Sequence, residues 1–388
     1  MLAKLFHAKP DDILRIAKPK RSAHSTILIV TENEGESLNQ NLHVLRGVAI
    51  IFVLIDHIFE LVPQLGSLGV AIFFVISGFL MFDLNRMKSG ALDGRKFIKA
   101  RFIRIYPMLI FSTLFTTLLV LVGLIGKESV KKIDYFESIP FIVLGIPNFF
   151  GLMPWNSPDL PPGFIPLWSV GVEIQFYFLI ACLIYFGKLN IKSTWFIMSL
   201  IIVGLISHVL VLIITEDVSF WTMPFTYISL FSFGIWVSMK EIKLPHKTNV
   251  INQCVLLIGI LFTLIFLLWM EFNSLEDYYG LGYTIFELLA MAIFYMGIRF
   301  GVGHLNNRFM RWVSSRSYSL YLMHFPIRTL VIENFSVTDT NIFVNLLIFS
   351  LSLAIAEITY RFVEVRFWTP KYSGNTMASS FFKGNKQV

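Results

Sequence analysis

Two ionisable side chains, Arg46 and His57, lie inside one long apolar run near the start of the chain. Their spacing of eleven residues corresponds in an α-helix to about 16 Å of rise and about three full turns. Both side chains are therefore expected on one helix face. An ionisable group inside a membrane span costs at least a few kcal/mol, so each is a functional candidate by default. A single histidine in such a helix can equally be a packed hydrogen-bonding group, but the aligned arginine favours a catalytic role for His57.

Arg101 and Arg104 follow one another at a three-residue spacing in the segment RKFIKARFIRIYP. This spacing places both guanidinium groups on one face of a helix. Arginine stays charged and offers paired donors, which suits an anionic phosphate group. The alternative is topological, because basic residues also collect at the cytoplasmic boundary of a membrane span.

Further polar residues fall inside apolar runs. Glu173, in LWSVGVEIQFY, could orient or charge-stabilise an imidazole such as that of His57, or could pair with a neighbouring helix. Tyr318, Tyr321 and His324 recur every three residues and form one polar stripe, which fits the wall of a site or a contact between helices. Asp56 is adjacent to His57 and points about 100° away around the helix, so it is a poor partner for it.

Other signals are weak. His208 and Glu287 are interpreted as packing residues. Cys182 and Cys254 both lie in apolar runs, so no disulfide framework or cysteine-based zinc site is expected. The sequence contains no HEXXH motif, phosphate-binding loop or GxSxG elbow, and no metal is predicted.

The elements that must position these residues are predicted to be membrane helices. Of the 388 residues, 55% are hydrophobic and only 15% are charged, against roughly 25% charged in a soluble domain. About ten runs are long and apolar enough to span a bilayer. We place them at 44–62, 66–83, 103–126, 166–187, 195–215, 221–239, 250–270, 281–299, 317–332 and 341–360. The predicted fold class is an all-α polytopic bundle, preceded by a polar tail (1–40) and followed by a short polar tail (369–388); the transmembrane domain is 41–368.

The net charge of +7 reflects topology rather than nucleic-acid binding. Lysine and arginine concentrate in alternate connecting segments, while the acidic loop residues fall mostly in the others, as the positive-inside rule requires. With ten spans, both termini are expected in the cytoplasm. The longest exterior segment, 127–165, carries six prolines, which predicts an irregular loop rather than a helix. No cleavable signal peptide is indicated.

Six segments occur in an order that resembles the acyltransferase-3 family of integral membrane acyltransferases. They are LHVLRGVAIIFVLIDH, GVAIFFVISGFLMF, RFIRIYP, LWSVGVEIQFYFL, SYSLYLMHFPI and EITYRFVEVRF. The resemblance implies that His57 is the essential histidine and that Arg101 and Arg104 bind the donor. It gives Arg46 and Glu173 essential roles beside the catalytic histidine. Ser77, in the second segment, joins His324, Tyr318 and Tyr321 as a candidate wall of the site.

The same resemblance implies an acyl-CoA donor, usually acetyl-CoA, bound from the cytoplasm, with no resident cofactor. It implies an acceptor hydroxyl on an extracytoplasmic carbohydrate such as O-antigen, exopolysaccharide or peptidoglycan, in the inner membrane of a bacterium. Some family members carry a C-terminal SGNH domain that this chain is not expected to have. His57 would act as a general base or as a transient acyl carrier. A transporter or flippase, and a membrane scaffold, are the alternative functions.

Overall fold

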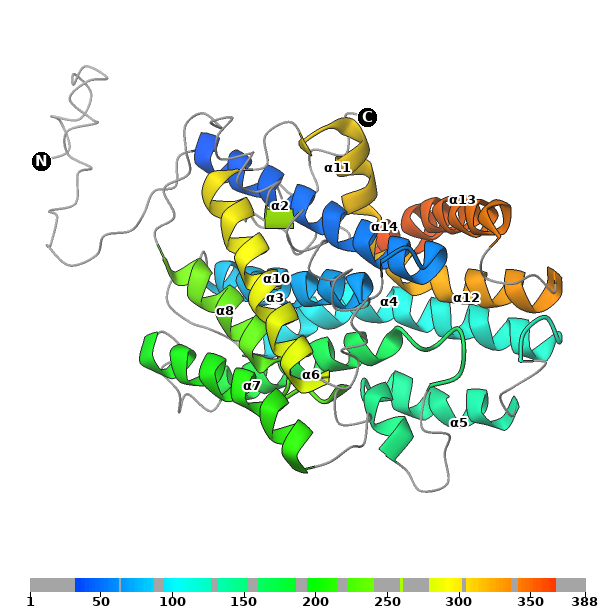
Figure 1. The fold of residues 1–388 in the computed structure, drawn as a ribbon, viewed down its shortest axis with the longest axis horizontal. Coiled ribbons are helices and arrows are strands. Elements are labelled where there is room, and N and C mark those ends of the chain that lie inside the picture. Colours follow the sequence, from blue (N-terminus) through cyan, green and yellow to red (C-terminus); the bar gives the residue numbers. More distant parts are fainter. Residues whose placement is uncertain are drawn as a thin grey trace, which may run out of the picture.

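The computed structural model describes residues 32–62, 64–86, 94–126, 132–152, 160–185, 194–214, 222–240, 259–260, 279–301, 305–335 and 341–367. Over these ranges every regular element is a helix, in agreement with the predicted all-α class (Figure 1). The α-helices are α2 (Glu32–Leu54), α3 (Leu65–Arg86), α4 (Gly94–Leu121), α5 (Lys132–Val143), α6 (Leu167–Tyr185), α7 (Thr194–Ile214), α8 (Ile228–Met239), α10 (Tyr279–Phe300), α11 (Arg308–Ser315), α12 (Ser317–Phe335), α13 (Ile342–Thr359) and α14 (Val365–Phe367). Two π-helices, η2 (Ile55–Phe59) and η7 (Tyr360–Glu364), and one 3₁₀ helix, η3 (Pro147–Leu152), complete the set.

Nine of the ten predicted spans overlap a described helix, although the bounds of α2, α4 and α8 differ from the prediction by seven residues or more at one end or both. The predicted span 250–270 and the C-terminal tail lie outside the described residues, apart from the short helical piece 259–260. Three of the described helices are long and apolar enough to cross a membrane: Gln40–Phe59, Phe97–Leu121 and Ile342–Phe367. The number of spans and the side on which each terminus lies stay predictions.

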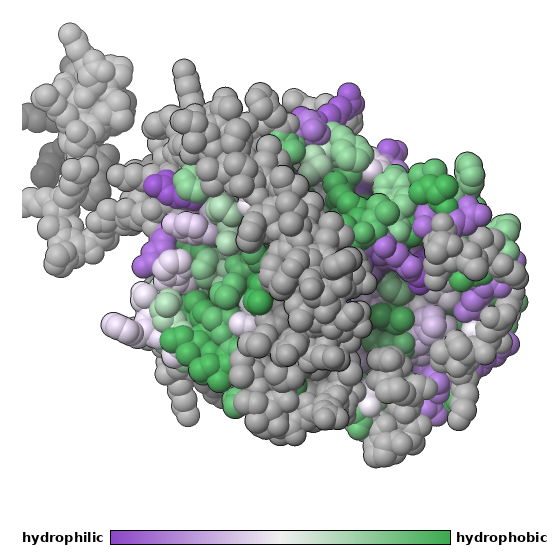
Figure 2. Space-filling model, viewed as in Figure 1, coloured by the Kyte–Doolittle hydropathy of each residue, from purple (hydrophilic) through white to green (hydrophobic). Residues whose placement is uncertain are grey.

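The outer face of α7 shows the apolar exposure expected of a lipid-facing helix. Its exposed large side chains are Trp195, Met198, Ile202, Val203, Ile206 and Leu210, a spacing that marks one helical stripe. Figure 2 shows hydrophobic side chains gathered at the lower left of this face, where α7 and α8 lie in Figure 1. A soluble protein rarely exposes so large a contiguous apolar patch.

Two predicted irregular segments are partly helical. α2 begins at Glu32 and so includes the end of the predicted polar tail, because a polar helix can extend beyond the hydrocarbon layer. The exterior segment 127–165 contains the regular helix α5, with Pro140 inside it. The prediction that prolines exclude a helix there was wrong. Pro140 lies in the last third of α5, so its missing N–H affects only the final turns, and the other described prolines follow the helix.

Helix α3 lies at the centre of the bundle, packed against α2, α8, α10 and α6. Its contact with α8 is close enough to require glycine on both helices. A Cβ at Gly78 would lie 2.1 Å from the carbonyl oxygen of Phe231, and one at Gly234 would lie 2.1 Å from that of Val75. Small residues allow such backbone approach between helices in a membrane. The crossing fixes the position of Ser77, which is adjacent to Gly78.

His57 lies on the π-helix η2 at the end of α2 rather than on a regular α-helix. After it Glu60 adopts a left-handed conformation with φ of 50°. The Asp56 carboxylate accepts a hydrogen bond of 2.8 Å from the backbone N–H of Gly66, at the start of α3. Asp56 thus anchors the turn to α3. Single π turns inside α-helices occur frequently at functional sites.

Candidate active site

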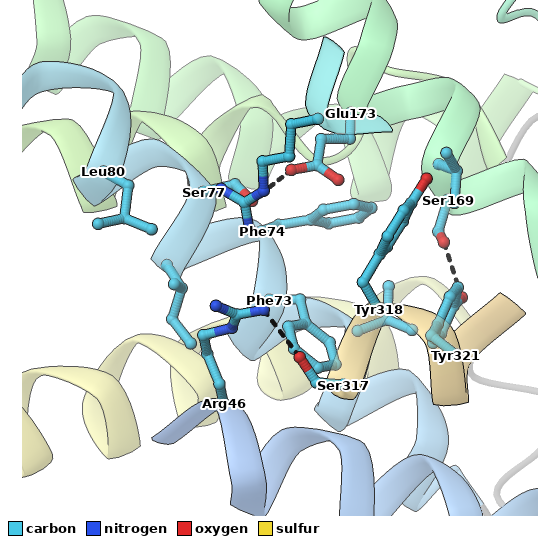
Figure 3. Close-up of a pocket in the computed structure, with 14 residues that line it drawn as sticks. Arg46, Phe73, Phe74, Ser77, Leu80, Ser169, Glu173, Ser317, Tyr318 and Tyr321 are labelled. Carbon is cyan, nitrogen blue, oxygen red and sulfur yellow. Dashed lines mark hydrogen bonds between the residues drawn. The ribbon is translucent and has the colours of Figure 1, made fainter. Parts of the chain in front are cut away.

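A narrow buried cavity opens between α2, α3, α4, α6 and α12 (Figure 3). Its polar lining consists of Arg46, Ser77, Arg104, Ser169, Glu173, Ser317, Tyr318 and Tyr321. Its volume of about 60 Å³ has room for only a few water molecules, at roughly 10–15 Å³ each.

Arg46 enters the cavity from α2 and is 5% exposed. Its guanidinium group donates a 2.8 Å hydrogen bond to the Ser317 hydroxyl at the start of α12. Arg104 also lines the cavity, so two guanidinium groups share it. In a site of low dielectric constant, fixed cationic donors strongly stabilise a negative charge that develops on a bound group.

Glu173 lies opposite Arg46 in the cavity and comes from the first turns of α6 (Figure 3). Its carboxylate accepts a 2.6 Å hydrogen bond from the Ser77 hydroxyl of α3 and another from the Tyr177 hydroxyl. Both donors therefore hold the carboxylate in one orientation at the cavity wall. The structure gives His57 a different hydrogen-bond partner, so Glu173 does not orient that imidazole by direct contact.

Arg101 and Arg104 differ in environment although they are one turn apart on α4. The Arg101 side chain is 3% exposed; it donates to the Leu80 carbonyl oxygen at 3.3 Å and lies 4.9 Å from the ring centroid of Tyr177. Its Nε has no hydrogen-bond partner among the described residues. Arg104 faces the cavity. The pair is thus adjacent, and only Arg104 contributes to the cavity lining.

His57 pairs with His324 rather than with a carboxylate. The His57 Nδ1 and His324 Nε2 atoms are 3.0 Å apart, and the two rings are parallel within 1°. Phe325 packs against both rings at 5.0 Å between centroids. His57 is not part of the cavity lining, but the ring of Tyr321, which is, lies 5.7 Å from that of His324. The histidine pair therefore adjoins the cavity wall.

The prediction that Arg46 and His57 share a helix face holds in one respect. Both side chains contact α12, at Ser317 and at His324, which lie seven residues or about two turns apart. The straight α-helix assumed for that prediction was wrong, because η2 advances fewer degrees per residue than an α-helix.

The Tyr318, Tyr321 and His324 stripe combines the two roles that the sequence left open. Tyr318 and Tyr321 line the cavity and also join helices. The Tyr318 hydroxyl donates to the Ile105 carbonyl oxygen at 2.9 Å, and the Tyr321 hydroxyl lies 2.7 Å from that of Ser169. Two cavity residues, Ser169 and Ser317, were not singled out from the sequence. Ser169 follows Trp168 in the segment LWSVGVEIQFYFL, and Ser317 precedes Tyr318 in the segment SYSLYLMHFPI. Their place in these segments was the signal that could have identified them.

Glu287 lies away from the cavity. Glu287 is 2% exposed and accepts a 2.7 Å hydrogen bond from Ser229, as expected of a packing residue. The side chain of His208 and the whole of Cys254 lie outside the described residues. Within the described part of the chain, no group of three histidine, cysteine, aspartate or glutamate side chains could hold a metal ion.

Comparison with known proteins gives one family. The family model described as an acyltransferase domain matches residues 39–361, which include every residue of the cavity and the histidine pair. No solved structure matches the chain.

Several curated relatives are O-acetyltransferases by name. The chain is 27% identical to the peptidoglycan O-acetyltransferase OatA of Listeria monocytogenes, over 88% of this chain and 57% of that protein. It is 27% identical to the O-acetyltransferase OatA of Staphylococcus aureus, over 82% and 55%. It is 25% identical to the putative peptidoglycan O-acetyltransferase YrhL of Bacillus subtilis, over 82% and 53%. The chain therefore spans a little over half the length of these relatives.

Proposed function

The chain belongs to the acyltransferase-3 family, and from this premise we propose that it is a multi-pass membrane O-acyltransferase. The proposed reaction moves an acyl group, acetyl in the first instance, from cytoplasmic acyl-CoA to a hydroxyl of a carbohydrate beyond the membrane. The observation that carries the proposal is the buried cavity in which Arg46 and Arg104 face Glu173 beside the His57–His324 pair. An uncharged solute or a structural role would not call for a buried Arg46 and a half-buried Arg104 in one cavity.

The donor is proposed to bind first at Arg101 and Arg104 and then to extend into the cavity toward Arg46. Arg101 and Arg104, on α4, would hold the phosphates of acyl-CoA, because guanidinium groups bind phosphate through paired donors. The thioester arm would then lie in the narrow cavity that Arg104 lines. Arg46 would donate to the carbonyl oxygen of the thioester and stabilise the oxyanion that forms there.

His57 is proposed to act directly on the acceptor hydroxyl. As a general base, its imidazole takes the hydroxyl proton while the oxygen attacks the thioester carbonyl carbon. The tetrahedral intermediate collapses, the C–S bond breaks, and the imidazolium returns the proton to the departing CoA thiolate. The products are a carbohydrate ester and CoA. If His57 first accepts the acyl group itself, the same atoms are exchanged in two steps.

Peptidoglycan is the first acceptor to assay, because two of the relatives are named as peptidoglycan enzymes. O-antigen and exopolysaccharide are the other proposed acceptors. The experiment uses a bacterial strain that lacks the gene, complemented with wild type, His57→Ala or Arg101→Ala/Arg104→Ala. Base-labile acetyl esters on each isolated glycan are quantified by mass spectrometry.

Matched controls separate catalysis from folding. His43→Ala alters a histidine on the same helix that bonds Ser314 instead of lining the site, and Arg308→Ala alters an exposed arginine at the start of α11. We expect esters with wild type and both controls, and none with His57→Ala or the double arginine variant at equal membrane abundance. Identical ester content on every glycan from every strain would refute the acyl-transfer proposal and favour the alternative function of a transporter or flippase.

A further inference from the structure

A continuous hydrogen-bonded chain links a backbone carbonyl of α12 to the proposed catalytic histidine. The Nδ1 atom of His324 lies 3.1 Å from the carbonyl oxygen of Leu320, one turn earlier in α12. The other ring nitrogen, Nε2, lies 3.0 Å from Nδ1 of His57. The His324 side chain has no exposed surface, so these contacts define its surroundings together with the aromatic rings beside it.

The direction of each hydrogen bond in this series follows from the Leu320 carbonyl oxygen, which can act only as an acceptor. A carbonyl oxygen can only accept, so Nδ1 of His324 carries a proton and donates to Leu320. In a neutral imidazole the other nitrogen is then the acceptor, so Nε2 of His324 is unprotonated. The proton between the two rings therefore belongs to Nδ1 of His57. This leaves Nε2 of His57 with a free lone pair.

The neutral state of both rings is also consistent with their partners. Neither ring has a carboxylate hydrogen-bond partner among the described residues. The positive charge of Arg328 acts on both rings and disfavours a second positive charge there. A buried imidazolium without a counter-ion is costly. His324 thus occupies the position that a carboxylate holds behind histidine in other catalytic arrangements, but it supplies an acceptor without a charge.

The free Nε2 of His57 faces a position where the chain has no side chain. A Cβ added to Gly66 would lie 2.7 Å from Oδ2 of Asp56 and 2.9 Å from Nε2 of His57, both closer than ordinary van der Waals contact. Gly66 is held in place by its backbone N–H, which donates to Asp56. Glycine at this position keeps the lone pair uncovered from the side of α3.

We propose that His324 is a positioning residue that fixes His57 in its Nδ1-protonated tautomer and makes Nε2 the reactive nitrogen, exposed past Gly66. The inference rests on the proposed function, because it assigns a part in that reaction. It applies to both chemical routes, since a base and an acyl carrier each need a free lone pair on the reacting nitrogen. When Nε2 takes up the proton, Nδ1 continues to donate to His324, which stabilises the imidazolium in place.

The tautomer can be measured without any assay of transfer. The full chain, labelled with ¹⁵N histidine and reconstituted in lipid nanodiscs, gives distinct ¹⁵N shifts for protonated and bare ring nitrogens. Comparison with His57→Gln assigns the signals of His57 among the 8 histidines. We expect protonated Nδ1 and bare Nε2 in wild type, and loss of that preference in His324→Leu. A wild-type His57 protonated on Nε2 overturns the inference whatever the activity.

Kinetics with acetyl-CoA and a carbohydrate acceptor give the second test. His324→Leu removes the acceptor and keeps the bulk, whereas His324→Gln retains an acceptor oxygen near the position of Nε2. We expect kcat of His324→Leu to fall at least about tenfold and by no more than the ~10²–10⁴ that a general base contributes, with KM for acetyl-CoA little changed. His324→Gln should recover most of kcat.

The two failures are distinguishable. If wild type transfers nothing from acetyl-CoA, the proposed function is wrong, and the ¹⁵N measurement still decides the tautomer. If wild type is active and both variants match it, or both lose activity together with protein abundance, His324 has no positioning role.

Discussion

Gly78→Ala is expected to disrupt both the bundle and the cavity, because it inserts a methyl group where two helix backbones meet. The new Cβ would lie 2.1 Å from the Phe231 carbonyl oxygen and 2.8 Å from the Phe231 Cα, both closer than the 3.4 Å at which ordinary contact begins. Neither neighbouring atom belongs to a flexible side chain, so α3 and α8 must separate. Ser77 then moves with α3 away from Glu173, to which it donates at 2.6 Å.

The magnitude follows from the rigidity of both partners. Overpacking a core usually costs about 1–3 kcal/mol, and backbone against backbone belongs at or beyond the upper end. A cost of about 3 kcal/mol lowers the ratio of folded to unfolded protein by about two orders of magnitude, since 1.4 kcal/mol is tenfold. Gly47→Ala is the milder comparison on α2, because its Cβ would lie 3.2 Å from the Met310 Cε and 3.3 Å from the Met310 carbonyl oxygen, so a shift of a few tenths of an ångström accommodates it. Its own helix gains about 0.5–1 kcal/mol from the alanine.

The assay is thermal unfolding of both purified variants in the same detergent, followed by acyl transfer at a temperature where each is folded. We expect Gly78→Ala to melt several degrees below wild type and to transfer more slowly, and Gly47→Ala to melt close to wild type with full activity. Equal melting temperatures for the two variants would refute the close α3–α8 crossing, and with it the placement of Ser77.

Two further predictions concern the cavity itself. Arg104→Ala should raise KM for acyl-CoA by roughly tenfold or more, from the loss of charge-assisted hydrogen bonds worth about 1.5–3 kcal/mol, while Arg308→Ala leaves KM unchanged; steady-state kinetics decide, and an unchanged KM in Arg104→Ala would remove it from the donor path. Glu173→Gln keeps an acceptor for Ser77 and Tyr177 but loses the negative charge. We expect normal abundance with kcat reduced about tenfold, which corresponds to about 1.4 kcal/mol of lost electrostatic stabilisation in the reaction. Full activity in this variant would limit the carboxylate to packing.

Some helices were predictable from the sequence to within two residues, whereas others begin up to twelve residues away from the predicted span, as α2 does at Glu32 against a predicted 44. The span predicted at 166–187 is α6, Leu167–Tyr185, and that at 195–215 is α7, Thr194–Ile214. The reason is physical: bilayer thickness sets the length of an apolar run, so composition alone places its ends. The π-turn at Ile55–Phe59 was not predictable in this way, because no composition rule distinguishes it from a continuing α-helix.

The pairing of site residues was accessible only in part. Sequence identified Arg46, His57 and Glu173 as costly in a membrane, but it suggested Glu173 as the partner of His57. The structure pairs Glu173 with Ser77 and Tyr177 instead. Partners 267 residues apart, as His57 and His324 are, depend on which helices pack together and in what register. Periodicity within one helix carries no information on either.

One face of α12 aligns the two halves of the proposed site. Ser317, Tyr321 and His324 follow at spacings of four and three residues, which places them on one side of the helix. They bind Arg46 of α2, Ser169 of α6 and His57 of η2 respectively. The cationic end of the cavity and the histidine are therefore positioned against the same rigid element. A displacement of α12 would move Ser317, the partner of Arg46, and His324, the partner of His57, together. Such a displacement would therefore disturb the positions of Arg46 and of the His57 imidazole at the same time.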